Sequence, residues 1–350
     1  VRAGHGGAVM ARSSRHYDES DVRIRPNRRG SRPRSKDRPA HEDAVPGQVI
    51  TVDRGRYTTL VGDGGDRHVV MAMRARELGR KGIVVGDRVD VVGDTSGADG
   101  SLARIVRVQP RETVLRRTAD DTDPVERVLV ANADQLVVVS ALANPEPRPR
   151  LIDRCLVAAY DAGMEPLLVL TKADLTDPGP FLEQYAPLSV RHVVTARRDT
   201  RTDGLDTLRE ALSGRVSVLV GHSGVGKSTL VNALVPQALR ATGVVNDVTG
   251  RGRHTSSSAV ALALPDDDGW VIDTPGVRSF GLAHVDLSRI VQHFADLEPG
   301  TATCPRGCTH DEPECGLDAW VASGDAGPAG PARLDSLRRL LRARSAPTTD

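Results

Sequence analysis

Residues that could bind phosphate lie between Gly221 and Ser228, which match every position of G-x-x-x-x-G-K-[ST]. The apolar stretch Val216–Val220 before them predicts a buried strand, and Thr229–Leu234 after them predicts a helix, the context that this motif needs. Glycines let successive backbone N–H groups turn toward a phosphate, and the N-terminus of a helix adds partial positive charge. The sequence therefore predicts a site for a nucleoside triphosphate.

Within this phosphate loop, Lys227 can reach the β- and γ-phosphates and Ser228 can ligate Mg²⁺. The alternative is a chance glycine turn before a helix, which the flanking strand and helix make the weaker reading. The expected nucleotide contacts of this loop are Gly221, His222, Ser223, Gly224, Val225, Gly226, Lys227, Ser228 and Thr229.

A second set of residues could bind metal. Cys304, Cys308, His310 and Cys315 supply three thiolates and one imidazole within twelve residues. Cys₃His is a donor set of structural zinc sites, closed and without an open position for catalysis. The alternative is three independent thiols and a loop histidine, which the density of the cluster disfavours. We expect one structural Zn²⁺ here, and we interpret the isolated Cys155 as a packing residue.

Two short loops could read the base of the nucleotide. Thr171, Lys172, Ala173 and Asp174 follow the apolar run 166–170 and resemble the guanine-specificity motif [NT]-K-x-D, with threonine where asparagine is commoner. Asp174 can accept from N1–H and the N2 amine of guanine, a donor pair that adenine lacks. Alone this motif is weak, and an ATPase or a solvated strand end are the alternatives, but a phosphate loop in the same chain favours guanine. Thr195 and Ala196, after the predicted strand His192–Val194, resemble the [ST]-A base-contact loop.

Further loops could act at the γ-phosphate. The predicted strand Gly269–Ile272 leads into Asp273-Thr274-Pro275-Gly276, a match to D-x-x-G. We expect Asp273 to hold Mg²⁺ through water and the Gly276 N–H to contact the γ-phosphate. Thr255 ends a glycine-rich loop and is expected to complete the Mg²⁺ ligands with Ser228 and Asp273.

The position after Gly276 is Val277, which cannot orient the attacking water as a glutamine does in many GTPases. His254 is our candidate for that task, with a solvated loop histidine or an RNA contact as the alternative. The expected catalytic residues are therefore His254, Lys227, Thr255 and Gly276.

The order of these loops is unusual for a GTPase. Strand-like runs at 135–140, 166–170 and 192–194 alternate with helical patterns at 150–161, 181–185 and 205–212, which predicts a parallel sheet covered on both faces. Along this α/β fold the base-reading loops precede the phosphate loop, so the motifs run G4-G5-G1-G2-G3. The sequence predicts a circularly permuted P-loop GTPase.

The flanking segments have their own patterns. Five short β-type runs between Gly47 and Val108 predict a small barrel, and an OB-fold fits best. They contain one aromatic residue, Tyr57, which argues against a stacking platform for single strands and favours contact with structured RNA. Before them, Val22–Arg38 holds seven Arg and one Lys against one Asp. This disordered arm is expected to contact nucleic-acid phosphates, with a solubilising tail as the alternative.

At the other end, Arg333–Arg344 predicts an amphipathic helix. Its leucines, Leu334, Leu337 and Leu341, are expected inside. Its other arginines are expected to be exposed and available to phosphates; they are Arg338, Arg339, Arg342 and Arg344.

Bulk properties set the remaining expectations. The 350 residues carry a net charge of +1, and their longest apolar runs have only strand length, so we expect no membrane span. Val1–Met10 has no apolar core and is not expected to be a signal peptide, and Met10 is an alternative start to Val1. We expect a cytoplasmic protein and, as a default, a monomer.

Together these motifs resemble the RsgA (YjeQ) family of small-ribosomal-subunit biogenesis GTPases. The resemblance covers residues 46–342 and rests on T-K-A-D, G-H-S-G-V-G-K-S-T, G-R-H-T, D-T-P-G and the cysteine cluster, whose two outer spacings are each one residue shorter than the family pattern. It implies a GTPase that turns GTP into GDP with Mg²⁺, is activated by the small subunit and contacts its 16S rRNA late in maturation. A permuted GTPase of the large subunit, or an RNA-binding protein with a vestigial nucleotide site, are the alternatives.

The expected organisation is multidomain. It comprises a basic arm (1–45), an OB-fold barrel (46–112), a circularly permuted GTPase domain (113–281), a helical zinc-binding module (282–344) and a tail (345–350).

Overall fold

The structure is a computed structural model, and the residues that it describes are 41–79, 82–117, 126–199, 201–236, 259–274, 282 and 285–345. The arginine-rich segment Val22–Arg38 lies outside these ranges. Within them, no helix combines the length and the apolar character that a membrane span requires.

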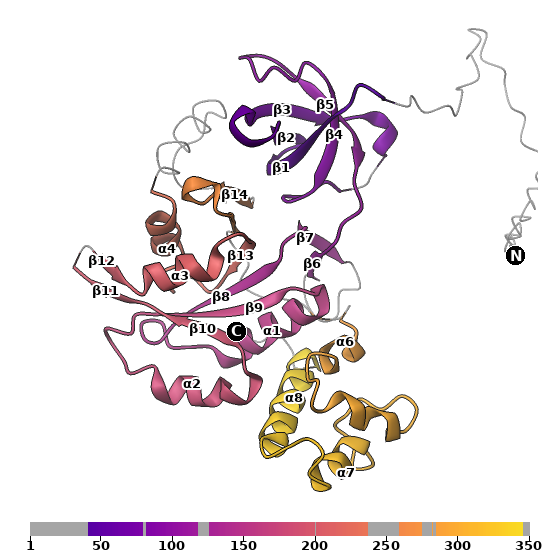
Figure 1. Ribbon diagram of the computed structural model, residues 1–350, viewed down its shortest axis with the longest axis vertical. Helices are drawn as coiled ribbons and strands as arrows, with labels where there is room; N and C mark the ends of the chain where they lie inside the picture. The colour runs from indigo at the N-terminus through magenta and orange to yellow at the C-terminus, as the bar shows by residue number, and fades with distance from the viewer. Residues whose placement is uncertain are drawn as a thin grey trace, which may run out of the picture. The chain divides into compact units, whose positions relative to one another are not determined.

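The N-terminal strands close into a five-stranded barrel (Figure 1). Neighbours pair in the order β1-β2-β3-β5-β4, and β4 pairs back onto β1, so the ring has no free edge. The β3–β5 pairing is parallel and the others are antiparallel. The OB-fold prediction is confirmed. The strands are β1 (Val45–Asp53), β2 (Arg56–Val61), β3 (His68–Arg74), β4 (Arg88–Gly93) and β5 (Ala103–Val108).

Buried and exposed side chains alternate along the strands, which explains how the barrel forms an apolar core. In β3, Val70 and Ala72 are fully buried while Val69 and Met73 face outward, as the two-residue period of a strand requires. Tyr57 is only 6% exposed and packs in the barrel core. The described strands of the barrel therefore expose no Phe, Tyr or Trp side chain.

The α/β part is built on a sheet in which five strands run parallel. All seven residues of β8 are buried, because helices cover both of its faces and a strand buried on both sides reads as a continuous apolar run. The five parallel strands, in spatial order, are β10 (Arg191–Val194), β9 (Glu165–Thr171), β8 (Gln135–Ala141), β13 (Val216–Val220) and β15 (Trp270–Asp273).

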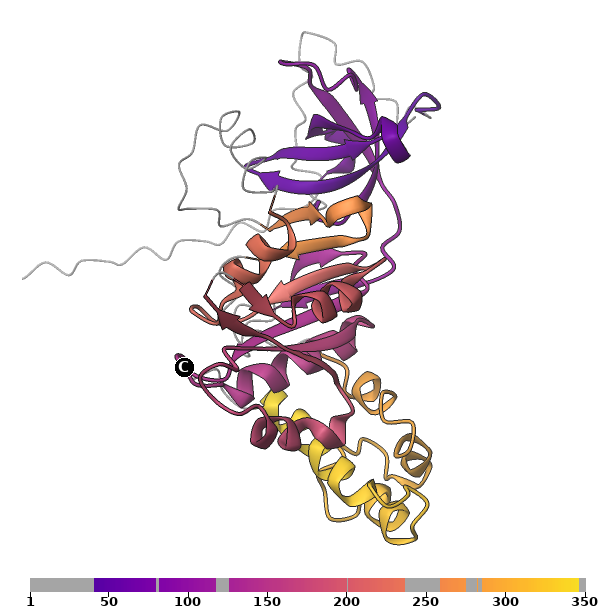
Figure 2. The same cartoon turned by 60° about the vertical axis from the view of Figure 1, so that its left-hand side comes forward.

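Helices on the two sides of this sheet form two separate cores, and Figure 2 shows the layers from a second direction. On one side α1 (Pro149–Ala162) packs against Leu136 and Val138 of β8. On the other, α3 (Leu205–Leu212) and α4 (Lys227–Leu234) pack against Val137 and Val139. Consecutive residues of β8 thus pack into the two cores on opposite sides of the sheet. A short helix, α2 (Gly179–Tyr185), follows β9.

Several short strands were not predicted. An antiparallel strand, β14 (Val260–Ala263), pairs with β15 and meets β1 of the barrel at Thr51 opposite Val260. These runs have only three to five residues and take their conformation from the strand they pair with, so no local period reveals them. The others form two hairpins: β6 (Val114–Arg117) with β7 (Arg127–Ala131), and β11 (Ala196–Arg198) with β12 (Arg201–Asp203).

The C-terminal part is helical, and its core is continuous with that of α1. Leu334, Leu337 and Leu341 are buried as predicted, within the cluster that contains Leu156 of α1. Its elements are α6 (Leu287–Val291), the 3₁₀ turn η6 (Glu298–Thr303), α7 (Gly316–Ala322) and α8 (Gly330–Ser345). Other 3₁₀ turns are η2 (Gly64–Asp66), η3 (Arg76–Leu78), η4 (Ala186–Leu188) and η5 (Pro265–Asp267).

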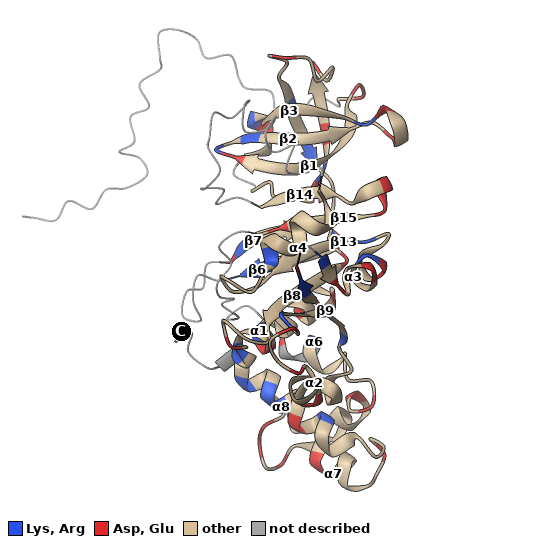
Figure 3. Ribbon diagram, turned by 90° about the vertical axis from the view of Figure 1, so that its left-hand side faces the viewer, with Lys and Arg blue, Asp and Glu red and all other residues tan. Residues whose placement is uncertain are grey.

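The prediction for the arginines of α8 was wrong at two positions. Basic residues do recur along this helix (Figure 3). However, Arg338 and Arg339 are partly buried and pair with Asp318 and Asp153. Arg342 is exposed, but it too is paired, with Asp311. The periodicity identified the buried leucines correctly, but it could not show that carboxylates from α1, α7 and the loop before α7 would reach the arginines.

Candidate nucleotide and metal sites

The predicted phosphate loop connects β13 to α4 at the carboxyl end of the sheet. Gly221 touches β8 so closely that a Cβ there would lie 2.5 Å from the Val139 carbonyl oxygen. Gly226 has φ of 93°, in the left-handed region, and precedes the first turn of α4. Both positions therefore require glycine. The loop carries its backbone N–H groups to the N-terminus of α4, the arrangement that binds phosphate.

Lys227 and Asp273 form an ion pair at this edge. Asp273 is the last residue of β15 and Leu219 lies opposite it on β13, the strand that leads into the phosphate loop. The next residue, Thr274, donates a hydrogen bond to the Leu219 carbonyl at 2.7 Å. Two parts of the chain that are 46 residues apart thus place an ammonium and a carboxylate together, next to the exposed Ser228.

The T-K-A-D loop is tied directly to the phosphate loop. The Thr171 hydroxyl donates to the Val225 carbonyl at 2.6 Å. The Lys172 ammonium donates to the Gly224 carbonyl at 3.0 Å. The structure therefore joins the predicted base-reading and phosphate-binding segments, although the bonded residues are 54 and 52 positions apart in the sequence.

The two base-reading loops also contact each other. The Ala173 N–H donates to the Thr195 carbonyl at 3.2 Å. The Arg197 N–H donates to a carboxylate oxygen of Asp174 at 2.9 Å. Asp174 is exposed, so its other oxygen can still accept from a base. Ala196, predicted as part of the second loop, is also the first residue of β11.

One segment near this site was missed by sequence reasoning. The Asn144 carbonyl accepts a hydrogen bond from Lys172, and the Pro145 Cδ lies 3.5 Å from where a Cβ on Gly224 would be. This segment follows β8, the strand beside β13, so it leaves the sheet at the edge where the phosphate loop begins. The sequence could have indicated this segment by its position directly after a fully buried strand, because ligand loops lie at the carboxyl ends of parallel strands.

The cysteine cluster has the dimensions of a metal site. The candidate ligand atoms of Cys304, Cys308, His310 and Cys315 all lie within 4.8 Å of one another. The Cys304 sulfur is 3.6 Å from His310 Nδ1 and 3.9 Å from the Cys315 sulfur. Tetrahedral zinc with bonds of about 2.0–2.3 Å separates its ligands by about 3.4–3.8 Å. The cysteines are free thiols, so these donors fit zinc.

The protonation chemistry of the cluster also fits a metal. Burial raises the pKa of the Cys308 thiol to about 12, and burial lowers the pKa of His310. A neutral imidazole is the form that ligates metal, whereas the thiols give up their protons only when a cation stabilises the thiolates. Metal binding would therefore release protons.

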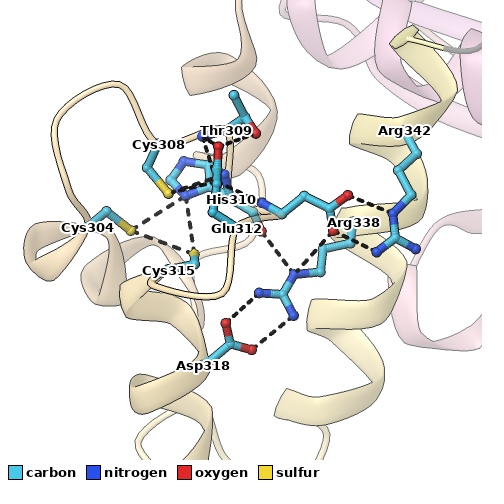
Figure 4. A network of polar contacts seen from close by, with 10 residues as sticks. Cys304, Cys308, Thr309, His310, Glu312, Cys315, Asp318, Arg338 and Arg342 are labelled. Atoms are coloured by element: carbon cyan, nitrogen blue, oxygen red, sulfur yellow. Dashed lines mark hydrogen bonds and ion pairs between the residues drawn. The ribbon is translucent and has the colours of Figure 1, made fainter.

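A carboxylate organises one turn of the cluster (Figure 4). Glu312 accepts hydrogen bonds from the Thr309 hydroxyl at 2.7 Å and from its N–H at 3.0 Å. These bonds hold the pKa of Glu312 at about 2.

The fourth cysteine, Cys155, lies apart from this cluster. It is only 1% exposed and belongs to the core around α1, which confirms its interpretation as a packing residue.

Comparison with known proteins identifies the family. The RsgA GTPase family model matches residues 108–283. The chain is 35% identical over 300 residues to the small ribosomal subunit biogenesis GTPase RsgA of Chlorobaculum tepidum, covering 81% of this chain and 94% of that protein. The chain belongs to the RsgA GTPase family. As a member it is a GTP hydrolase with circularly permuted motifs, as the order of its loops predicted.

Other RsgA-family proteins are similar to this chain in sequence and in fold. The RsgA of Gemmatimonas aurantiaca is 36% identical over 266 residues, covering 75% of this chain and 86% of that protein. The crystal structure of YjeQ from Thermotoga maritima matches with a TM-score of 0.61 at 27% identity, covering 87% of this chain and 99% of that one. The structure of YloQ, described as a circularly permuted GTPase, matches with a TM-score of 0.60 at 22% identity, covering 88% of this chain and 98% of that one, and supports the fold.

Three predicted residues lie outside the described ranges. They are His254, Thr255 and Gly276, and their assigned roles stay predictions.

Proposed function

We propose that this RsgA-family GTPase binds the small ribosomal subunit through 16S rRNA, assists its late maturation, and turns over GTP faster when bound to it. We infer the binding partner, the small ribosomal subunit, from the relatives, which are named as small ribosomal subunit biogenesis GTPases. The observation that supports the GTPase site is the pair of hydrogen bonds from Thr171 and Lys172 to the phosphate loop, because they bring together the two distant segments that we assign to guanine and to phosphate.

In the nucleotide site we assign one task to each side chain. Asp174 accepts from the guanine N1–H and N2 amine, and Lys172 lies along the base. The phosphate loop and Thr229 surround the phosphates, while Lys227 leaves Asp273 to contact the β- and γ-phosphates. Thr195 and Ala196 complete the base pocket through their contact with the T-K-A-D loop.

We propose that GTP is bound with Mg²⁺. The donors present fit the ion: a hydroxyl from Ser228 in the first turn of α4 and a carboxylate from Asp273 at the end of β15, both oxygen ligands of the kind that Mg²⁺ prefers. Thr255 would add a second hydroxyl. Mg²⁺ would neutralise charge on the phosphates, and the Gly276 N–H would contact the γ-phosphate. His254 would position the attacking water, the task that Val277 cannot perform.

In the C-terminal module, Cys304, Cys308, His310 and Cys315 would hold one structural Zn²⁺. The ion would stabilise a segment, residues 304–315, whose described backbone forms neither helix nor strand. We place a domain boundary near residue 112, before the permuted GTPase domain, and another near 281, before the zinc module. The basic arm, residues 1–45, would add phosphate contacts on the subunit.

A turnover measurement tests this function. GTP and ATP hydrolysis by the full chain would be measured alone, with purified small subunits and with large subunits. We expect GTP-specific turnover that only the small subunit stimulates, and a Lys227→Ala variant should lose it. Stimulation by the large subunit alone would assign the enzyme to a different particle, and turnover insensitive to Lys227→Ala would place hydrolysis elsewhere.

A further inference from the structure

Two consecutive arginines of α8, Arg338 and Arg339, contact different parts of the molecule. Arg339 pairs with Asp153 of α1, with 3.2 Å between Nε and the carboxylate oxygen, and its guanidinium lies 4.9 Å from the centre of the Tyr185 ring. Arg338 turns instead toward the metal-binding segment, residues 304–315. Helix α8 therefore holds this segment from one side and the GTPase core from the other.

The Arg338 guanidinium donates hydrogen bonds to two residues (Figure 4), and its Nε also lies 3.9 Å from a carboxylate oxygen of Asp311. Its Nε–H donates to the His310 carbonyl at 2.9 Å. Its two terminal nitrogens donate to the two oxygens of Asp318, at 2.9 and 2.7 Å. The Arg338 side chain is only 16% exposed. A planar, partly buried fork that satisfies two acceptors at once fixes their relative position.

Both partners are close to metal ligands. His310 is itself a candidate ligand, and its φ of 68° is a left-handed conformation that a side chain rarely adopts without outside support. Asp318 lies in the first turn of α7, which begins directly after the candidate ligand Cys315. Arg338 thus holds the backbone of one ligand and the helix that follows another.

We propose that Arg338 is a positioning residue for the zinc centre, holding His310 and Cys315 at the separation that the metal requires. This inference rests on the proposed zinc site. Metal sites depend on such outer contacts, and their loss typically weakens metal binding 10–100-fold. Because Arg338 contacts the His310 backbone and not its ring, it acts on ligand geometry and leaves the identity of the donor atoms unchanged.

Arg342, one turn further along α8, is the matched control. It makes its own two-point contact with Asp311, at 2.8 and 2.6 Å, but its side chain is 65% exposed. An exposed ion pair contributes little. Arg338 and Arg342 are therefore arginines of the same helix that both lie near Asp311, but Arg338 is the one that is partly buried and bonded to His310 and Asp318.

The test measures zinc affinity of the full chain by competition with a chromophoric chelator. We expect Arg338→Gln to bind zinc about 10–100-fold more weakly than wild type, and Arg342→Gln to stay within about threefold. Arg338→Lys should fall between them, because an ammonium cannot serve both acceptors in one plane. Equal affinity of Arg338→Gln and wild type would overturn the inference, while a wild type that binds no zinc would overturn the proposed site itself.

A spectroscopic measurement separates positioning from general stability. With Co²⁺ in place of zinc, the visible absorption reports how close the ligands are to a tetrahedron. Arg338→Gln at saturating Co²⁺ should show altered bands, whereas Arg339→Gln should lower the melting temperature and leave the bands unchanged. An unaltered Co²⁺ spectrum in Arg338→Gln would show that Arg338 only supports the fold. If Arg338→Gln does not fold, Asp318→Ala removes the contact of Arg338 with α7 while leaving its bond to the His310 carbonyl, and it is expected to alter the bands likewise.

Discussion

The Thr171 hydroxyl donates a 2.6 Å hydrogen bond to the Val225 carbonyl, and this bond joins the T-K-A-D loop, the proposed guanine-reading loop, to the predicted phosphate loop. Threonine stands here where the motif more often has asparagine, and its shorter side chain still reaches the neighbouring loop. Thr171 is buried, so water cannot replace the bond if the hydroxyl is lost.

Replacing Thr171 by valine should weaken GTP binding. Valine keeps the shape but leaves the Val225 carbonyl without its donor, a loss of about 1–1.5 kcal/mol, or about 5–10-fold in affinity. Titration with a fluorescent GTP analogue measures the effect. Thr171→Ser, which keeps the hydroxyl, should bind nearly as well as wild type; a valine variant with unchanged affinity would show that the two loops hold their places without this bond.

Lys227→Ala should abolish most turnover. The variant removes a cation that we place on the β- and γ-phosphates, where loss of one stabilising group costs about 10²–10³ in rate. It also leaves Asp273 without its partner. Steady-state phosphate release measures the loss. Arg209→Ala, which removes an exposed cation paired with Asp206 on α3, is the control and should retain wild-type rates.

Asp174→Asn should change the preferred base. The asparagine oxygen can still accept from the Arg197 N–H, so the loop keeps its contact, but the amide no longer accepts from both guanine donors. We expect GTP affinity to fall at least ~100-fold, since a site built for a hydrogen bond rejects a mismatched partner strongly. Xanthosine triphosphate, which has an oxygen in place of the N2 amine, should gain affinity. Competition among GTP, ATP and xanthosine triphosphate decides the matter, and an unchanged preference for GTP would remove Asp174 from base recognition.

Removal of zinc should destabilise the C-terminal module. A ligand that binds only the folded state at 1,000 times its Kd contributes about 4 kcal/mol. We expect one zinc per chain by elemental analysis and a lower melting temperature after treatment with a strong chelator. Cys308→Ser should lose the metal, whereas Cys155→Ala should keep it, because Cys155 lies in the core around α1. Equal zinc content in the two variants would contradict the assignment.

The barrel should contain a pH-dependent loop contact. Both ring nitrogens of His68 face carbonyl oxygens, Asp66 at 3.0 Å and Thr95 at 2.8 Å. Only the charged ring can donate to both, and these backbone hydrogen bonds raise the pKa of His68 above 6.5. Since the folded pKa is the higher one, the stabilisation is complete below about pH 6.5 and is lost as pH rises through the folded value.

Hydrogen exchange of residues 94–100 measures this contact. Protection, corrected for the intrinsic dependence of exchange on pH, should be greater at pH 6 than at pH 8 in wild type. His68→Gln should show no such difference, because glutamine does not titrate. A pH effect that persists in His68→Gln would assign it to another group.

Elements with strong local patterns were predictable. Leu205–Leu212 was predicted with the bounds that the structure gives it, and the strand and phosphate loop around Gly221 were recognised because glycine spacing and apolar runs are local signals. The short strand Val260–Ala263 was not, because a four-residue strand takes its conformation from the strands beside it.

The sequence by itself determined the chemistry of this protein: the phosphate loop, the T-K-A-D motif and the cysteine cluster each occupy a few consecutive residues, so their donor types and spacing can be read directly. Only the tertiary structure decided which distant groups meet. It joined Thr171 to Val225 and Lys227 to Asp273, and it directed Arg338 and Arg339 inward. The physical reason is that an ion pair or hydrogen bond depends on distance in space, and the packing of α8 on α1, or of one strand beside another, is set by the whole core.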